Sequence, residues 1–215
     1  MTGKAYMIAA LEEVSRVIME NEAVLNRLDN AIGDGDHGTN MARASRMMLK
    51  LLPELAETRD DMGDILHQVG MSCISEIGGS AGPLFGTFYL RAGMVNHGKT
   101  TMEPADWVAS FEAGAVGVSQ LGMSTEGEKT MLDALFPADR AMQEALEAGK
   151  SLQEILAAGV EAARDGVEYT KTIQASKGRA AYIGERSIGH QDPGATTIML
   201  MIQAMHKVAV DMNAG

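Results

Sequence analysis

The sequence predicts an all-α protein, and three observations support this prediction. Alanine, methionine, leucine and glutamate, which favour helices, are frequent, whereas aromatic residues make up only 4% of the chain. No stretch alternates convincingly between apolar and polar residues, as a half-buried strand would. Apolar residues recur instead every three or four positions, the spacing of a helix face that packs on a core. We expect one domain over residues 1–215, with roughly eight helices and no confident strand.

The first half of the chain contains four segments with helical spacing: residues 8–28, with a polar patch at 20–22, then 41–52, 62–77 and 83–95. The second segment is expected to stop at Pro53, because proline lacks an amide hydrogen and clashes with the preceding turn of a helix. Pro83, by contrast, suits the first turn of the fourth segment.

The second half contains predicted helices at residues 104–121, 152–173 and 195–212, and a polar, glycine-rich segment at 176–194. Two capping-box patterns predict where helices begin. One pairs Thr125 with Glu128, and the other pairs Ser151 with Glu154. Residues 125 and 151 are therefore expected to precede two helices.

Charge and composition exclude several classes of protein. The formal net charge of −11 disfavours nucleic acid and anionic membrane surfaces as partners. No apolar run approaches the ~20 residues that cross a bilayer. The single cysteine, Cys73, excludes an internal disulfide and a thiolate metal cluster. The first residues lack the apolar region of a signal peptide, so we expect a cytoplasmic protein.

Three carboxylates, Asp29, Asp34 and Asp36, lie among glycines between two helix-like segments. Two such charges about 4 Å apart repel by ~4 kcal/mol at an effective dielectric constant near 20 unless a cation joins them. Three oxygen ligands suit Mg²⁺ or Ca²⁺, and Mg²⁺ typically adds substrate phosphates to a few carboxylates. A solvated acidic turn is the alternative interpretation.

Two other motifs were compared with this loop, and neither explains it. Gly33, Gly35 and Gly38 match G-x-G-x-x-G, but the dinucleotide motif follows a strand, whereas this loop follows helix-like sequence. The calcium loop of an EF-hand fails because Thr39 and Ser45 stand where it requires glycine and glutamate.

A second loop, residues 78–83, matches the nucleophile pattern G-x-S-x-G around Ser80. A hydrolase elbow needs a strand before the serine, and residues 71–77 look helical, so this function is disfavoured. The backbone amides of the loop are better suited to an anion at the start of the next helix. An ordinary connection between two helices is the remaining alternative.

A third segment, residues 177–194, is too long and too polar for a simple connector. Arg179 and Arg186 are available to neutralise phosphate. Asp192 followed by Pro193 has the form of a helix start. Arg186 is equally well explained as a surface ion-pair partner, and His190 as a hydrogen-bonding group at a helix end.

These three loops, together with residues 127–133, resemble the L subunits of dihydroxyacetone kinases. The likeness runs nearly from end to end, and residues 177–196 carry the most specific part of it. It implies an antiparallel barrel of eight helices that holds a nucleotide, ADP or ATP, at its rim. One departure concerns the second loop, where relatives can read Ala-Ser in place of Ser80-Ala81. It leaves open whether Ser80 or a backbone amide makes that contact.

The resemblance also implies roles for individual residues. Two Mg²⁺ ions that bridge to the phosphates would be held by Asp29, Asp34 and Asp36. The phosphate side of the nucleotide site would be lined by His37, Gly38, Thr39 and Asn40, with Ser80 and Ala81 opposite them. The base or ribose would be contacted by Gly122 and Met131. The site would be closed by Arg179, Asp192, Pro193 and Gly194. Arg179 would stabilise charge on the transferred group. Charge counting agrees with two ions, because three carboxylates and a triphosphate carry about seven negative charges and two Mg²⁺ leave about three.

The same resemblance implies that this chain is half of a kinase. A separate K subunit would bind dihydroxyacetone through a histidine, and a phosphohistidine carrier would recharge bound ADP. Use of free ATP, and a related ketose such as erythrulose, remain alternatives, and a homodimer is a further candidate assembly. A metal-dependent phosphohydrolase and a non-catalytic metal-binding helical module are the competing classes.

Overall fold

The computed structural model describes residues 2–213, which are largely helical. Within this range the elements, in order, are β1 (Thr2–Gly3), α1 (Lys4–Glu20), α2 (Glu22–Ile32), α3 (His37–Thr58), α4 (Met62–Glu76), α5 (Ala81–Val95), β2 (Thr101–Met102), α6 (Pro104–Gly122), α7 (Leu132–Glu147), α8 (Leu152–Thr170), the 3₁₀ helix η1 (Arg179–Ser187) and α9 (Pro193–Asp211). The two strands are too short to leave a period-two signal in the sequence, which explains why none was predicted.

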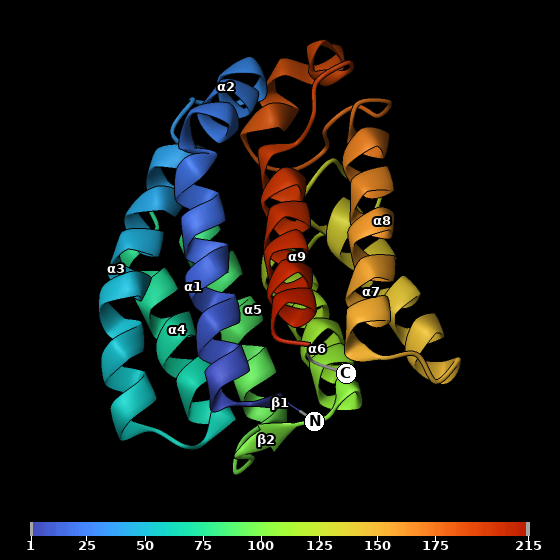
Figure 1. The fold of residues 1–215 in the computed structure, drawn as a ribbon. Coiled ribbons are helices and arrows are strands. Elements are labelled where there is room, and N and C mark those ends of the chain that lie inside the picture. Colours follow the sequence, from blue (N-terminus) through green and yellow to red (C-terminus); the bar gives the residue numbers. More distant parts are fainter. Residues whose placement is uncertain (1, 214–215) are drawn as a thin grey trace.

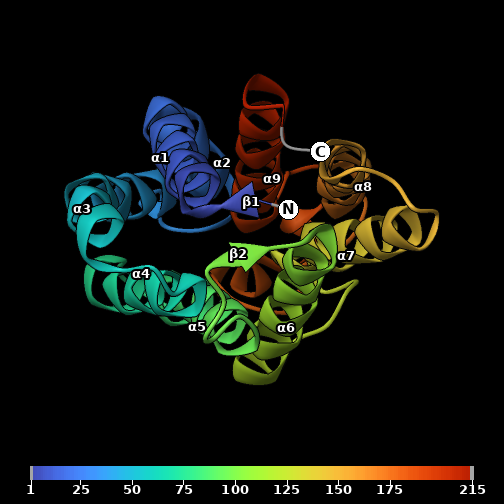
Figure 2. The same cartoon turned by 60° about the horizontal axis from the view of Figure 1, so that its bottom comes forward.

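The long helices form a closed antiparallel ring. Contacts run in sequence from α1 to α3 and on through α9, and α9 packs back on α1. Figure 2 shows this ring along its axis, and Figure 1 shows α2 and η1 at one end with the paired strands at the other. The prediction of an all-α barrel is therefore confirmed. No helix among residues 2–213 has the length and apolarity needed to cross a membrane.

The interior of the barrel is filled by one apolar core. Met7, Leu52, Ile65 and Leu132, from four different helices, are at most 1% exposed. The backbones of α4 and α5 lie close together where Gly63 faces the carbonyl of residue 93, since an added Cβ would lie 2.5 Å from that oxygen. Small residues at this crossing bring the two backbones together.

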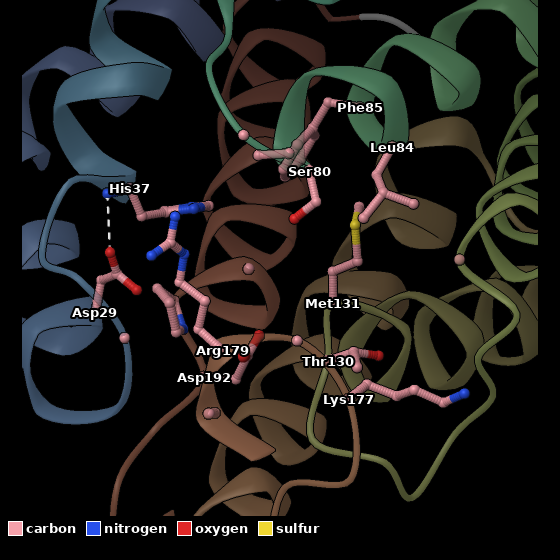
Figure 3. Close-up of a pocket in the computed structure, with 18 of the residues that line it drawn as sticks. Asp29, His37, Ser80, Leu84, Phe85, Thr130, Met131, Lys177, Arg179 and Asp192 are labelled. Atoms are coloured by element: carbon pink, nitrogen blue, oxygen red, sulfur yellow. Dashed lines mark hydrogen bonds between the residues drawn. The ribbon is translucent and has the colours of Figure 1, made fainter. Parts of the chain in front are cut away.

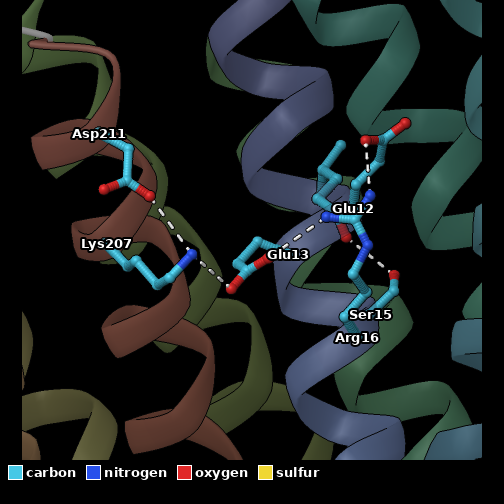
Figure 4. A network of polar contacts seen from close by, with 7 residues as sticks. Glu12, Glu13, Ser15, Arg16, Lys207 and Asp211 are labelled. Carbon is cyan, nitrogen blue, oxygen red and sulfur yellow. Dashed lines mark hydrogen bonds and ion pairs between the residues drawn. The ribbon is translucent and has the colours of Figure 1, made fainter.

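An ion pair between Lys207 and Glu13 joins the last helix to the first on the outside of the barrel, and further pairs within each helix flank it (Figure 4). Lys207 of α9 lies 3.0 Å from a carboxylate oxygen of Glu13 in α1 and 3.3 Å from Asp211. Arg16 lies 3.3 Å from Glu12 and from Glu13. Exposed pairs of this kind contribute only about 0–1 kcal/mol each, so apolar packing of α1 on α9 supplies most of the closure.

The prediction that a helix stops at Pro53 is wrong. Helix α3 continues through Pro53 to Thr58. Leu55, on the far side of the proline, is 3% exposed, and it packs into the core because the helix continues. Burial of Leu55, worth about 1.5–3 kcal/mol, offsets much of the cost of about 3 kcal/mol for an interior proline.

Two predicted boundaries also differ. The first helical segment breaks at Asn21, whose side chain donates 2.8 Å to the carbonyl of Val17. The capping-box pattern at residues 125–128 does not start a helix, although Glu128 accepts from the amide of Thr125 at 2.8 Å. Lys129 follows in a left-handed conformation with φ +61°, which ends that turn, and α7 begins at Leu132. The capping box at Ser151 is confirmed.

Candidate functional site

A cavity of about 770 Å³ opens at the end of the barrel where α2 and η1 lie. It brings together the three loops that the sequence singled out (Figure 3). Of the predicted site residues, those that line it are Asp29, Asp34, Asp36, His37, Asn40, Ser80, Ala81, Gly122, Met131, Arg179, Asp192, Pro193 and Gly194.

The three predicted metal-binding carboxylates converge on one side of this cavity. Asp29 lies in the last turn of α2, and its Oδ2 accepts the amides of Asp36 at 2.9 Å and His37 at 3.1 Å. Gly35 has φ +79°, which lets the loop turn back towards Asp29. One oxygen each of Asp29, Asp34 and Asp36 lies within 4.8 Å of the other two. This all-oxygen set fits a hard divalent cation such as Mg²⁺.

A second group of metal-capable side chains, Asp61, Asp64 and His97, has another explanation. Asp61 is the N-cap of α4, and its Oδ1 accepts the amides of Gly63 and Asp64. Its Oδ2 accepts the amide of Gly98 at 2.8 Å. These hydrogen bonds lower the pKa of Asp61 against the opposing effect of its partial burial. The carboxylate is therefore a helix cap that ties α4 to the loop before β2.

His37, the first residue of α3, is held inside the cavity wall. Its Nε2 lies 2.8 Å from Oγ1 of Thr197 in α9. Burial lowers the pKa of His37, and the nearby charges of Asp29 and Asp36 only partly oppose this. Burial therefore favours the neutral imidazole, which acts as a hydrogen-bonding group beside Thr197.

Gly38 and Thr39, also predicted to bind nucleotide, are turned towards α2 instead of the cavity. The amide of Thr39 donates 2.9 Å to Oδ1 of Asn26, and its hydroxyl donates 3.3 Å to Glu22. A Cβ at Gly38 would lie 2.1 Å from the carbonyl oxygen of Glu22. These two residues pack α2 against α3 and so fix the acidic loop between the helices.

Ser80 and Ala81 lie at the start of α5, on the wall opposite the acidic loop. Ser80 points into the cavity (Figure 3), and its side chain makes no capping hydrogen bond. Arg43 holds the preceding loop in place, because its Nε donates 2.7 Å to the carbonyl of Glu76. The segment before Ser80 is the helix α4, so the strand that a hydrolase elbow requires is replaced by a helix.

The third segment contributes a cation and a helix start. Arg179 Nη1 lies 2.9 Å from Asp34 Oδ2, so the guanidinium stands beside the carboxylate cluster. Asp192 caps α9 by accepting the amide of Ala195 at 2.7 Å. Burial raises the pKa of Asp192 to about 7, and the charge of Lys129 opposes the rise. Arg186 and His190 are not among the described residues that line the cavity.

The remaining wall is apolar and faces the polar loops. It is formed by Leu84 of α5, Val118 and Leu121 of α6, and Met131. Figure 3 shows Met131 and Leu84 pointing towards each other. Gly122, at the end of α6, adds no side chain to this wall. The cavity therefore combines a carboxylate-rich end with an apolar end that suits a flat ring.

One buried cation was missed at the sequence level. Lys129 is 1% exposed, and its Nζ donates to the carbonyl oxygens of Thr170, of Ile173 at 3.3 Å and of His190 at 2.5 Å. Burial lowers the pKa of Lys129, while Asp192 and Asp133 raise it. Lysines normally point to solvent, and the surrounding residues carry no apolar periodicity, so no local pattern could reveal this burial.

Comparison with known proteins adds independent findings. A family model described as the DAK2 domain matches residues 31–207. The chain is 41% identical over 181 residues, 84% of its length and 85% of the relative's, to the PEP-dependent dihydroxyacetone kinase, ADP-binding subunit DhaL, of Escherichia coli strain K12. It is 37% identical to the corresponding DhaL of PEP-dependent dihydroxyacetone kinase 1 of Listeria innocua, over 96% of this chain and 98% of the relative.

A solved structure shares the fold. The dihydroxyacetone kinase of C. freundii in complex with AMP-PNP and Mg²⁺ matches with a TM-score of 0.72 and 27% identity. The match covers 94% of this chain and 34% of the C. freundii chain. Human triokinase/FMN cyclase is 33% identical over 94% of this chain and 35% of its own length. The present chain thus spans about a third of both of these longer proteins.

Proposed function

This chain belongs to the DAK2-domain family, and from that premise we propose that it is the nucleotide-binding subunit of a dihydroxyacetone kinase. Relatives that it matches over most of their length are described as ADP-binding subunits of such kinases. The observation that carries the proposal is the convergence of Asp29, Asp34 and Asp36 within 4.8 Å beside a cavity of about 770 Å³.

The proposed ligand is Mg-ADP or Mg-ATP with two Mg²⁺ ions. Bound Mg²⁺ would be held by the three carboxylates and would neutralise phosphate charge. The side chains of Asn40, Ser80 and Arg179 line the polar end and are suited to phosphate oxygens. Leu84 and Met131 offer the apolar surface for the base. Gly38 and Thr39 would act indirectly, by fixing the loop between α2 and α3.

The proposed reaction transfers the γ-phosphoryl group to dihydroxyacetone on a separate K subunit. Arg179 would stabilise charge on the moving group, because an arginine fork matches phosphate oxygens well. Positioning and charge stabilisation supply most of the rate enhancement in phosphoryl transfer. The sugar and the groups that activate it would belong to the K subunit, so this chain would be active only in the complex.

We further propose that the nucleotide stays bound and that a phosphohistidine carrier recharges ADP to ATP. Relatives of nearly the same length are named as PEP-dependent or PTS-dependent, which supports this source of phosphate over free ATP. Native mass spectrometry of freshly purified protein should find ADP that survives gel filtration. A nucleotide-free, rapidly exchanging site would favour free ATP instead.

Thermal unfolding tests the nucleotide proposal. The midpoint temperature should rise with ADP only when Mg²⁺ is present, since a ligand that binds the folded state stabilises it by mass action. No rise with Mg-ADP would refute the proposal. A rise with metal alone and no further effect of ADP would favour a metal-binding module. Turnover of a phosphoester by the isolated chain would favour a phosphohydrolase.

Replacing Arg179 by alanine should change nucleotide and metal binding in opposite directions. Loss of a charge-assisted contact worth about 1.5–3 kcal/mol should weaken Mg-ADP binding about 10- to 100-fold. Mg²⁺ alone should bind a few-fold more tightly, because Asp34 loses the ion pair at 2.9 Å. Titration calorimetry measures both affinities, and Arg186→Ala is the control on the same segment. Equal changes in both affinities would contradict this role.

A further inference from the structure

Residues 171–192 form one long segment between α8 and α9, and its two ends are held together at its base. The amide of Gly189 donates 2.7 Å to the carbonyl of Lys171. The amide of Asp192 donates 3.0 Å to Oγ1 of Thr170. The segment thus closes on itself at its base, and it carries Arg179 to Asp34.

The ammonium group of Lys129 lies at this base and comes from a different part of the chain. It donates to the carbonyl of Thr170, the last residue of α8, and to that of Ile173, at the start of the segment. It also donates 2.5 Å to the carbonyl of His190, near the end of the segment. Its three N–H donors therefore join both ends of the loop, and they cap carbonyls at the end of α8.

The backbone at Lys129 supports a specific role for the side chain. Its φ of +61° is a conformation that glycine adopts freely and that other residues rarely adopt. The side chain is nevertheless 1% exposed, so a strained position holds a buried cation. Lys129 itself and the next two residues, Thr130 and Met131, line the cavity.

Two further hydrogen bonds attach segment 171–192 to the stretch of chain just before Lys129. The amide of Ser176 donates 3.3 Å to the carbonyl of Glu128. Lys177 Nζ donates 2.6 Å to the carbonyl of Met123. Among these contacts, those of Lys129 are made by a buried side chain, whereas the hydrogen bond of Lys177 is exposed to solvent.

We propose that Lys129 is a positioning residue that closes segment 171–192 over the cavity, so that Arg179 and Asp192 stand at fixed places on its wall. The side chain acts through Arg179 and Asp192, with its own donors spent on three carbonyls. The effect on ligand binding rests on the proposed function, whereas the effect on the loop does not.

The test compares Lys129→Met, which removes the donors and keeps most of the stem, with Lys171→Met as a matched control. Lys171 lies in the same segment, and its side chain pairs at 2.7 Å with Glu168 on the exposed surface. Hydrogen–deuterium exchange of the nucleotide-free proteins should show amides of residues 172–192 exchanging at least tenfold faster in Lys129→Met. Peptides from α4 and α5 should be unchanged, and Lys171→Met should match the wild type throughout.

Dissociation of Mg-ADP gives the second readout, and it should be at least tenfold faster in Lys129→Met. If the wild type binds no nucleotide, the proposed function is wrong, but hydrogen–deuterium exchange still tests whether Lys129 holds segment 171–192 in place. If the wild type binds and Lys129→Met releases ADP at the same rate, this inference fails. Lys129→Gly, which relieves the left-handed backbone, repeats the test in case the methionine variant unfolds. Unchanged exchange, or equal loosening of every helix in both variants, would overturn the positioning role.

Discussion

Replacing Asp34 by asparagine is expected to weaken Mg-ADP binding at least 100-fold, a loss of about 2.7 kcal/mol or more. Asp34 offers a carboxylate oxygen within 4.8 Å of those of Asp29 and Asp36, and the neutral amide lowers the negative charge of that cluster. The folded state should tolerate the change, because the ion pair of Asp34 is with Arg179, which is 66% exposed. Titration calorimetry with Mg-ADP, beside thermal unfolding without ligand, measures the two effects separately.

The matched control is Asp64→Asn in the other carboxylate cluster. One ligand atom each of Asp61, Asp64 and His97 also lies within 4.8 Å of the other two, but the carboxylate of Asp61 caps a helix and accepts hydrogen bonds from backbone amides. Asp64→Asn should leave Mg-ADP affinity within about twofold of the wild type, a free-energy change below about 0.4 kcal/mol, because Asp64 is not among the residues that line the cavity. Equal losses in both variants would mean that overall charge, rather than a built site, controls binding. The assignment of Asp34 would then be wrong.

Asp29 would be a poorer choice for this experiment. Its Oδ2 accepts the amides of Asp36 and His37, so the carboxylate also shapes the loop. A substitution there removes a ligand and loosens the turn together. A loss of Mg-ADP binding in a variant of Asp29 would therefore not separate metal binding from the shape of the loop.

Much of the fold followed from apolar spacing, because each long helix buries one face against a shared core. Pro53 shows where local rules fail. The clash of an interior proline is a local cost, whereas the burial of Leu55 on the far side depends on the whole barrel. Glu128 shows the reverse case, in which a capping contact forms but the left-handed Lys129 prevents a helix from following.

The loops that line the cavity were predictable from residue type, because carboxylates, glycines and an arginine gather in them, and the structure brings all three loops to one cavity. The direction of single side chains was not. Thr39 adjoins the acidic loop in sequence, yet its donor and acceptor groups are used by Asn26 and Glu22. Lys129 shows the same limit, because its partners lie 41 to 61 positions away along the chain. Long-range partners of this kind leave no local signal.

Asp139 in α7 should make the protein less stable as pH rises. It is 5% exposed, and among residues 2–213 its Oδ1 has no hydrogen-bond partner, although Oδ2 accepts 3.0 Å from Gln143. Burial raises the pKa of Asp139 to about 6, and the charge of Glu112 adds to the rise. Because the folded pKa exceeds the unfolded one, the protonated form favours folding. That advantage is lost as pH rises from about 4 to about 6, at a total cost of about 3 kcal/mol.

Asp139→Asn removes this titration and leaves a pH-independent side chain of similar shape. The free energy of unfolding of the variant relative to wild type should therefore improve by about 2 kcal/mol between pH 4.5 and pH 7.5. Urea unfolding at several pH values measures the difference, in which the contributions of the other buried acids cancel. Asp165→Asn, at an exposed position of α8, should show no such trend. If the difference in free energy of unfolding between Asp139→Asn and the wild type does not change with pH, the carboxylate stays ionised in the folded protein. Solvent or a local rearrangement then supplies the missing hydrogen bond.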